Sequence, residues 1–130
     1  MAFLNSQYNN NSVVPWVGTM PAAAGSYTVG QLLNVSGGKL TAITAALATT
    51  PPYVCNRTGT VTDGEPLPVS RISDDIIYET TLSAAAAGAD VGVKLQVSAG
   101  GTQVSTGAGT FEIAGLTGTA AGDTVWGRWV

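Results

Sequence analysis

Residues 91–97, Val-Gly-Val-Lys-Leu-Gln-Val, decide the fold class because their apolar side chains occupy every second position. A period of two is typical of a β-strand with one buried face, since successive strand side chains point to opposite sides of a sheet. Apolar residues also stand on both sides of Glu112, in the same alternation. Residues 123–129 are rich in Thr, Val and Trp, which favour strands. We therefore expect residues 82–130 to consist mainly of short strands.

Glycine-containing turns between these segments predict β-hairpins. Residues 98–101, Ser-Ala-Gly-Gly, separate the first strand from a return strand over residues 102–105. Earlier in the chain, the Ser-Gly-Gly of residues 36–38 separates an extended segment at 27–35 from its return at 39–43. Two independent hairpins indicate a mainly antiparallel architecture.

The sequence thus predicts a mainly β fold, either an antiparallel β-barrel or a sandwich. A chain of 130 residues is long enough to bury a core as one domain, which we place at residues 13–130. The Asn-rich residues 1–12 look like an extended, flexible N-terminal arm outside that core. Only the Ala-rich segments 42–47 and 82–87 suggest helix, and both are so short that we expect at most one short helix.

The charge pattern excludes several classes of partner. Only 10% of the residues are charged, the net charge is −3, and the five basic residues are scattered along the chain. A protein that binds nucleic acid directly needs a basic patch, so that role is not expected. The sequence also lacks an apolar run long enough to cross a membrane and a secretory signal at its start, so we expect synthesis in the cytosol and no membrane partner.

Catalytic and metal sites are not expected either. The chain has no histidine, and Cys55 is its only cysteine, so Ser-His-Asp, Cys-His and His-ligated metal schemes are all unavailable to it. The acidic groups at 63–65 and 74–75 can be interpreted as calcium ligands, but Asp-Gly is also a strong turn signal, and we favour the turn. The sequence therefore predicts a protein that is not an enzyme and has no cofactor.

Large apolar side chains remain as candidate contacts with a partner. In the arm, they are either part of a frayed terminus or anchors that order on binding. Near the C-terminus, two tryptophans three residues apart face opposite sides of a regular strand; either a bulge or a second layer buries both, or one is an interface anchor. The candidate residues for an interface with a partner or another subunit are Phe3, Leu4, Tyr8, Trp16, Trp126 and Trp129.

Four phrases of the sequence carry a family resemblance. They are residues 25–33 (GSYTVGQLL), 36–40 (SGGKL), 87–95 (AGADVGVKL) and 115–128 (GLTGTAAGDTVWGR). In this order they resemble the small head decoration, or cement, proteins of tailed bacteriophages. The likeness covers most of residues 20–130 and lies in strand-and-turn phrases rich in Gly, Ala and Thr.

The resemblance implies a compact β protein that binds the outside of the mature phage head and stabilises it by bridging subunits of the major capsid protein. It further implies a virion location and a homo-oligomer, with a trimer favoured. Two other classes fit the composition: a fibre or receptor-binding module, in which exposed aromatic residues stack on glycans, and a structural subunit of the head–tail joint or tail tube.

Overall fold

The computed structural model describes residues 2–8 and 17–130, and within them the chain is all β, with no helix. Its largest sheet has six strands, all paired antiparallel. In spatial order these strands are β1 (Leu4–Tyr8), β9 (Ile76–Thr81), β13 (Thr124–Trp129), β12 (Phe111–Leu116), β10 (Lys94–Val97) and β11 (Val104–Ala108).

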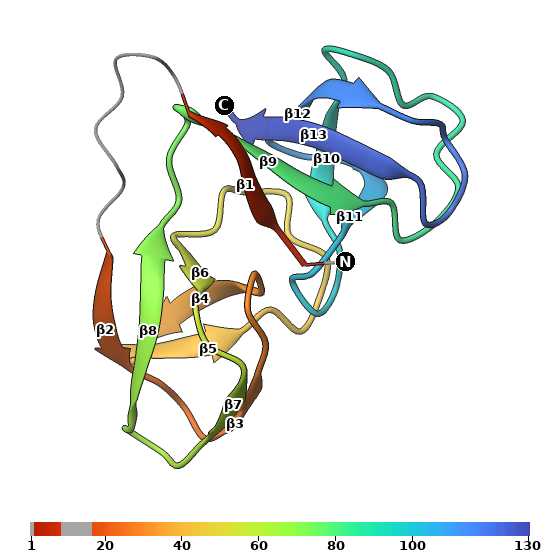
Figure 1. Cartoon of the computed structure of the whole chain (residues 1–130). Helices are drawn as coiled ribbons and strands as arrows, with labels where there is room; N and C mark the ends of the chain where they lie inside the picture. Colours follow the sequence, from red (N-terminus) through yellow and green to blue (C-terminus); the bar gives the residue numbers. More distant parts are fainter. Residues whose placement is uncertain (1, 9–16) are drawn as a thin grey trace.

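The other strands form a five-stranded and a two-stranded sheet, also antiparallel. The larger has the order β2 (Val17–Pro21), β8 (Pro66–Arg71), β6 (Tyr53–Cys55), β4 (Leu32–Ser36) and β5 (Lys39–Ala42), and the smaller pairs β3 (Gly25–Tyr27) with β7 (Gly59–Val61). Figure 1 shows the two large sheets as separate halves of the molecule, with β1 beside β9 in the half that holds the C-terminal strands. The predicted β class is confirmed, as a sandwich-like arrangement without a closed barrel.

The two halves are joined by one core and by backbone hydrogen bonds. Leu32, Ile43 and Val54 come from the half with the five-stranded sheet, yet they belong to the same buried cluster as the inward side chains of the six-stranded sheet. The Leu32 N–H donates to the carbonyl of Gly101 at 2.8 Å, and the Gly100 N–H donates to that of Ile43 at 2.8 Å. Apolar burial and this shared backbone pairing fix the halves against each other.

A second buried cluster lies within the half formed by residues 17–71. A parallel bridge between Ala22 and Leu40 links the chain just beyond β2 to β5, and the Ala23 N–H donates to the Leu40 carbonyl at 2.9 Å. The members of this cluster come from the five-stranded sheet, the two-stranded sheet and the chain beyond β2: Ala22, Tyr27, Leu33, Leu40, Cys55, Val61, Leu67 and Val69.

Both predicted hairpins are present. Residues 36–39 connect β4 to β5 through Gly37 (φ 58°) and Gly38 (φ 77°), left-handed conformations that glycine adopts without a steric penalty. Gly100 and Gly101 are also left-handed and turn β10 into β11. The predicted strand 91–97 is shorter than expected, because residues 90–93 form a turn that delays β10 until Lys94.

The structure places residues 2–8 differently from the expected arm. Phe3 is only 2% exposed, and its N–H donates to the Gly30 carbonyl at 2.9 Å. Residues 4–8 form β1, the edge strand beside β9. A polar sequence can form this edge strand because its backbone groups form the hydrogen bonds to β9, and one aromatic side chain, that of Phe3, is buried in the core. Residues 9–12 of the expected arm lie outside the described residues.

Candidate functional site

Two of the six candidate interface residues are part of the core. Phe3 and Trp129 are each 2% exposed, and their ring centroids are 5.2 Å apart. Phe111 meets both rings, edge-on to Phe3 at 5.8 Å and to Trp129 at 5.0 Å, and Tyr78 meets Trp129 at 5.0 Å. These side chains fill the interior and are not available to a partner in this fold.

Two other candidates lie together on the opposite, outer face of the same sheet. Leu4 of β1 is paired with Glu79 of β9, and Glu79 is paired with Trp126 of β13, so the three side chains form one row across three strands. The Trp126 indole N–H donates to Oε1 of Glu79 at 2.7 Å. Leu4 is 42% exposed and Trp126 is half-buried. The pairing register of the three strands therefore places in one row two residues that are 122 positions apart in the sequence.

The remaining two candidates cannot be placed as contacts. Tyr8 ends β1, where its backbone is paired with Ile76, but its side chain lies outside the described residues. Trp16 also lies outside the described residues.

The sequence analysis missed a third apolar residue beside this row. Val29 is 47% exposed and shares a hollow of about 160 Å³ with Leu4, at the place where the N-terminal segment crosses the other half of the molecule. Gly30 is left-handed here (φ 83°), and a Cβ on it would meet Ala2 and Phe3, so the crossing requires glycine. In the sequence, the Val29-Gly30 pair within a turn was the signal that could have indicated this exposed residue. We call Trp126, Leu4 and Val29 the apolar strip, in which the Glu79 side chain stands between Trp126 and Leu4.

The outer face around the strip carries balanced charge. Lys94, Glu112 and Arg128 stand opposite one another on β10, β12 and β13, and Arg128 Nε lies 3.7 Å from Glu112 Oε1. Together with Glu79, these are two positive and two negative side chains among the described residues of this face. The charges of these four side chains cancel, so they do not form a basic patch of the kind that tracks phosphates.

The possible reactive groups lie apart from the strip or are inert. Cys55 is fully buried, its Sγ–H donates to the Arg57 carbonyl at 3.0 Å, and burial raises the pKa of the thiol, so it stays neutral at pH 7. Asp63 pairs with Lys39 at 2.7 Å, and the next residue, Gly64, is left-handed (φ 82°), as a turn requires.

Two further observations concern only residues 2–8 and 17–130. No cluster of three or more His, Cys, Asp or Glu side chains there has the geometry to hold a metal ion. No helix in this part of the chain has the length and apolar character to span a membrane.

Fold and surface together define an all-β, sandwich-like protein with a solvent-facing apolar strip on a neutral face. No protein family model matches the sequence, and no curated protein matches it. Arguments about function therefore start from the strip, the charge balance and the composition.

Proposed function

We propose that this protein is a non-catalytic decoration, or cement, protein of a tailed-phage head. It binds the outer surface of the mature capsid and stabilises the shell by bridging neighbouring subunits of the major capsid protein. The resemblance in the sequence suggests this class, and the observation that carries the proposal is the apolar strip of Trp126, Leu4 and Val29.

The strip has the character of a docking surface. Aromatic residues at the centre of an interface dominate the energy of association, and Trp126 is held in a fixed orientation by its bond to Glu79 at 2.7 Å. An anchor that is already oriented loses little side-chain entropy on binding. Leu4 and Val29 extend the apolar contact across the junction of the two halves, so one partner surface can touch both.

Many weak contacts of this kind would stabilise a shell. Each copy contributes binding free energy only while the expanded lattice is intact, which shifts the equilibrium away from the disrupted shell. A copy that touches two capsid subunits at once gains from effective concentration, so modest single contacts become durable. The low net charge limits repulsion between the many copies on one head.

The test uses expanded, undecorated heads of the phage and the purified chain. We expect the chain to bind and to raise the temperature at which the heads disrupt, as followed by scanning calorimetry. Two matched pairs of variants locate the contact: Leu4→Ser against Val35→Ser, both at residues 42% exposed, and Val29→Ser against Val130→Ser, both at residues 47% exposed. The first member of each pair should weaken binding and the second should not. If the wild-type chain does not bind these heads, the proposal is overturned.

A receptor-binding module is the second candidate, and Trp126 is the observation that favours it. A half-buried indole beside the carboxylate of Glu79 can stack on a sugar ring while neighbouring polar groups bond its hydroxyls. A glycan array distinguishes the two functions. Saturable binding to a defined glycan that is lost in Trp126→Ala, together with no binding to heads, would replace the capsid function by this one.

A further inference from the structure

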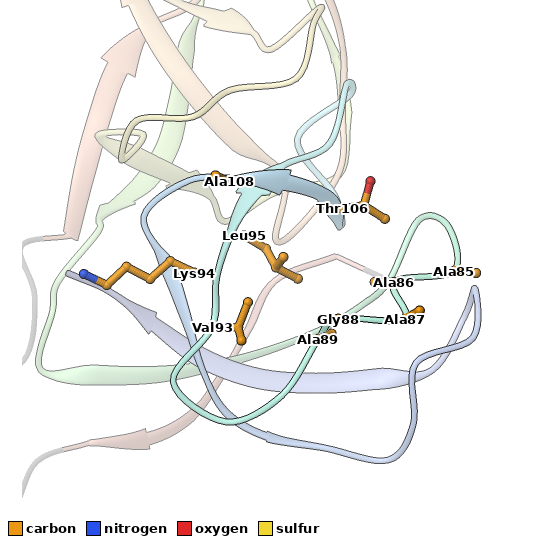
Figure 2. Close-up of a pocket in the computed structure, with 10 residues that line it drawn as sticks. All are labelled: Ala85, Ala86, Ala87, Gly88, Ala89, Val93, Lys94, Leu95, Thr106 and Ala108. Atoms are coloured by element: carbon orange, nitrogen blue, oxygen red, sulfur yellow. The ribbon is translucent and has the colours of Figure 1, made fainter.

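A hollow beside the alanine-rich loop 85–89 holds no converging polar side chains. Its volume is about 400 Å³, and Figure 2 shows the side chains of Val93 and Leu95 directed toward that loop. Of its two polar side chains, the Lys94 ammonium extends away from the other lining residues, which leaves the Thr106 hydroxyl alone. A small-molecule site needs several polar groups that converge on the ligand. The side chains of this hollow therefore do not specify a ligand.

A turn in the other half of the molecule does combine reactive groups. Residues 62–65 join β7 to β8 (Figure 1) and contain the one Asp-Gly pair of the sequence, Asp63-Gly64. An aspartate followed by glycine is prone to spontaneous isomerisation of the backbone, because glycine has no side chain to hinder attack of its nitrogen on the carboxyl group. The Asp63 side chain is 64% exposed, and a Cβ on Gly64 would have nothing within 4 Å. The peptide bond between them is therefore accessible to water.

The isomerisation needs only these two residues and water. The Gly64 nitrogen attacks Cγ of the protonated Asp63 carboxyl group, and an N–Cγ bond forms while the hydroxyl leaves with the nitrogen's proton as water. Water then adds to one of the two carbonyls of the resulting succinimide and opens the ring. Cleavage of the N–Cγ bond restores aspartate, whereas cleavage of the bond between nitrogen and the Asp63 main-chain carbonyl gives isoaspartate. One water leaves and one returns, so the mass of the chain is unchanged.

Two backbone hydrogen bonds clamp this turn to Ala22, a fully buried residue. The Gly64 N–H donates to the Ala22 carbonyl at 2.8 Å, and the Ala22 N–H donates to the Glu65 carbonyl at 3.0 Å. The Glu65 N–H also closes the turn by donating to the Thr62 carbonyl at 3.0 Å. The nitrogen that must attack Asp63 is thus engaged in a hydrogen bond, and the clamp has to open before the reaction begins.

Lys39 restrains the other reacting group. Its Nζ lies 2.7 Å from Oδ2 of Asp63, which ties the carboxylate to the beginning of β5. The carboxylate has to leave Lys39 before Cγ can turn toward the Gly64 nitrogen. Both side chains of the ion pair are exposed, by 39% and 64%, and exposed pairs contribute little to stability. The clamp at Ala22 is therefore the stronger of the two restraints.

We propose that Asp63 is a modification site, at which isoaspartate forms spontaneously at a rate set by opening of the Ala22 clamp. The site lies in the free chain and does not depend on the capsid-binding role. Isoaspartate adds Cβ of residue 63 to the main chain, so the turn cannot keep both hydrogen bonds to Ala22 in their present geometry. Because Ala22 is fully buried, its backbone groups lose their partners, and the modified chain should unfold at a lower temperature.

The first test measures isoaspartate in the purified full chain. The chain is stored at pH 7 below its unfolding temperature and digested with trypsin, which releases residues 58–71 with Asp63 as their only aspartate. Chromatography and electron-transfer fragmentation identify isoaspartate at unchanged mass. We expect it to form at least about tenfold more slowly than in the synthetic peptide 58–71, because the turn must open locally first. Equal rates in chain and peptide, or no isoaspartate in the chain long after the peptide has reacted, would overturn the proposal.

The second test separates the two restraints. Lys39→Gln should raise the rate about threefold, the size expected for loss of an exposed ion pair. Lys94→Gln is the matched control, because it removes the same charge from the six-stranded sheet, and it should react as the wild type does. Equal rates in the two variants would overturn the role of Lys39.

Hydrogen exchange reports on the clamp itself. The Gly64 N–H should exchange more slowly in the folded chain than in the peptide, and exchange as fast as in the peptide would overturn the clamp. Each of these measurements uses the free chain, so their outcome leaves the capsid function to its own test with heads.

Discussion

The two faces of the six-stranded sheet differ in what their aromatic residues do. On the inner face, Phe3 and Trp129 meet at 5.2 Å and are 2% exposed. On the outer face, Leu4 and Trp126 lie in one row and remain partly open to solvent. In each pair, one residue belongs to the N-terminal segment at residues 3–4 and the other to β13. The alternation of side chains along each segment places the two pairs on opposite faces of the sheet. Strand parity therefore separates the residues that fill the core from the candidate docking residues on the outer face.

The largest expected effect on this comparison is in Trp129→Ala. Removing a fully buried indole leaves a cavity among three other rings and should lower the free energy of unfolding by about 3–5 kcal/mol. Urea denaturation followed by circular dichroism measures it. If the variant does not fold, Trp129→Phe should fold with a smaller loss. A stability equal to that of the wild type would contradict the inner-face assignment.

Phe3→Ala should come next, with a loss of about 3 kcal/mol or more. The side chain fills the core between Phe111 and Trp129, so its removal is felt although it lies near the chain start. Leu4→Ala is the matched control on the outer face and should change stability by less than about 0.5 kcal/mol. Equal, small effects of both variants would mean that the N-terminal segment is an arm after all.

Glycines in β12 and β13 allow the two faces to be compared by adding a single Cβ to each. A Cβ at Gly127, on the inner face, would overlap the Glu112 carbonyl and the Phe111 ring. Gly127→Ala should therefore cost about 1–3 kcal/mol. A Cβ at Gly115, on the outer face, would stand 3.5 Å from Trp126 Cε3, an ordinary contact, so Gly115→Ala should cost much less. Thermal unfolding of the two variants measures both losses of stability. A larger loss in Gly115→Ala than in Gly127→Ala would contradict the assignment of the two faces.

Trp126→Ala should lower stability less than the substitutions on the inner face. Its indole is half-buried on the outer face, so we expect a loss of about 1 kcal/mol, mainly from the hydrogen bond to Glu79. Affinity for undecorated heads should nevertheless fall at least about tenfold, because an aromatic anchor is removed. Co-sedimentation with heads measures the affinity. Normal head binding by this variant would exclude Trp126 from the docking surface.

Local patterns predicted the strands and hairpins well. The alternation at residues 94–97 and around Glu112, and the glycine pairs at 37–38 and 100–101, act through neighbouring residues and are legible without knowledge of the fold. The strand start at Lys94 was misplaced because Val91 fits the alternation but is used in a turn. Parity left two alternatives for Trp126 and Trp129, burial of both or exposure of one, and in the structure Trp129 is buried while Trp126 is partly open to solvent.

The N-terminal segment shows where local patterns fail. Its polar composition indicated an arm, yet the structure seats residues 4–8 beside β9 and Phe3 in the core. The interactions that hold it come from segments distant in the chain, namely Gly30, β9 and the rings of Phe111 and Trp129, which no window around the segment contains.

The sequence by itself determined that the chain is β-rich, antiparallel and poor in charge, because period, turn residues and composition are properties of short segments. The tertiary structure alone decided which aromatic residues became core, which became surface, and that Leu4 would lie beside Val29 and in one row with Trp126. The reason is that strand pairing joins segments distant in the chain, and the register of that pairing selects the face on which each side chain lies.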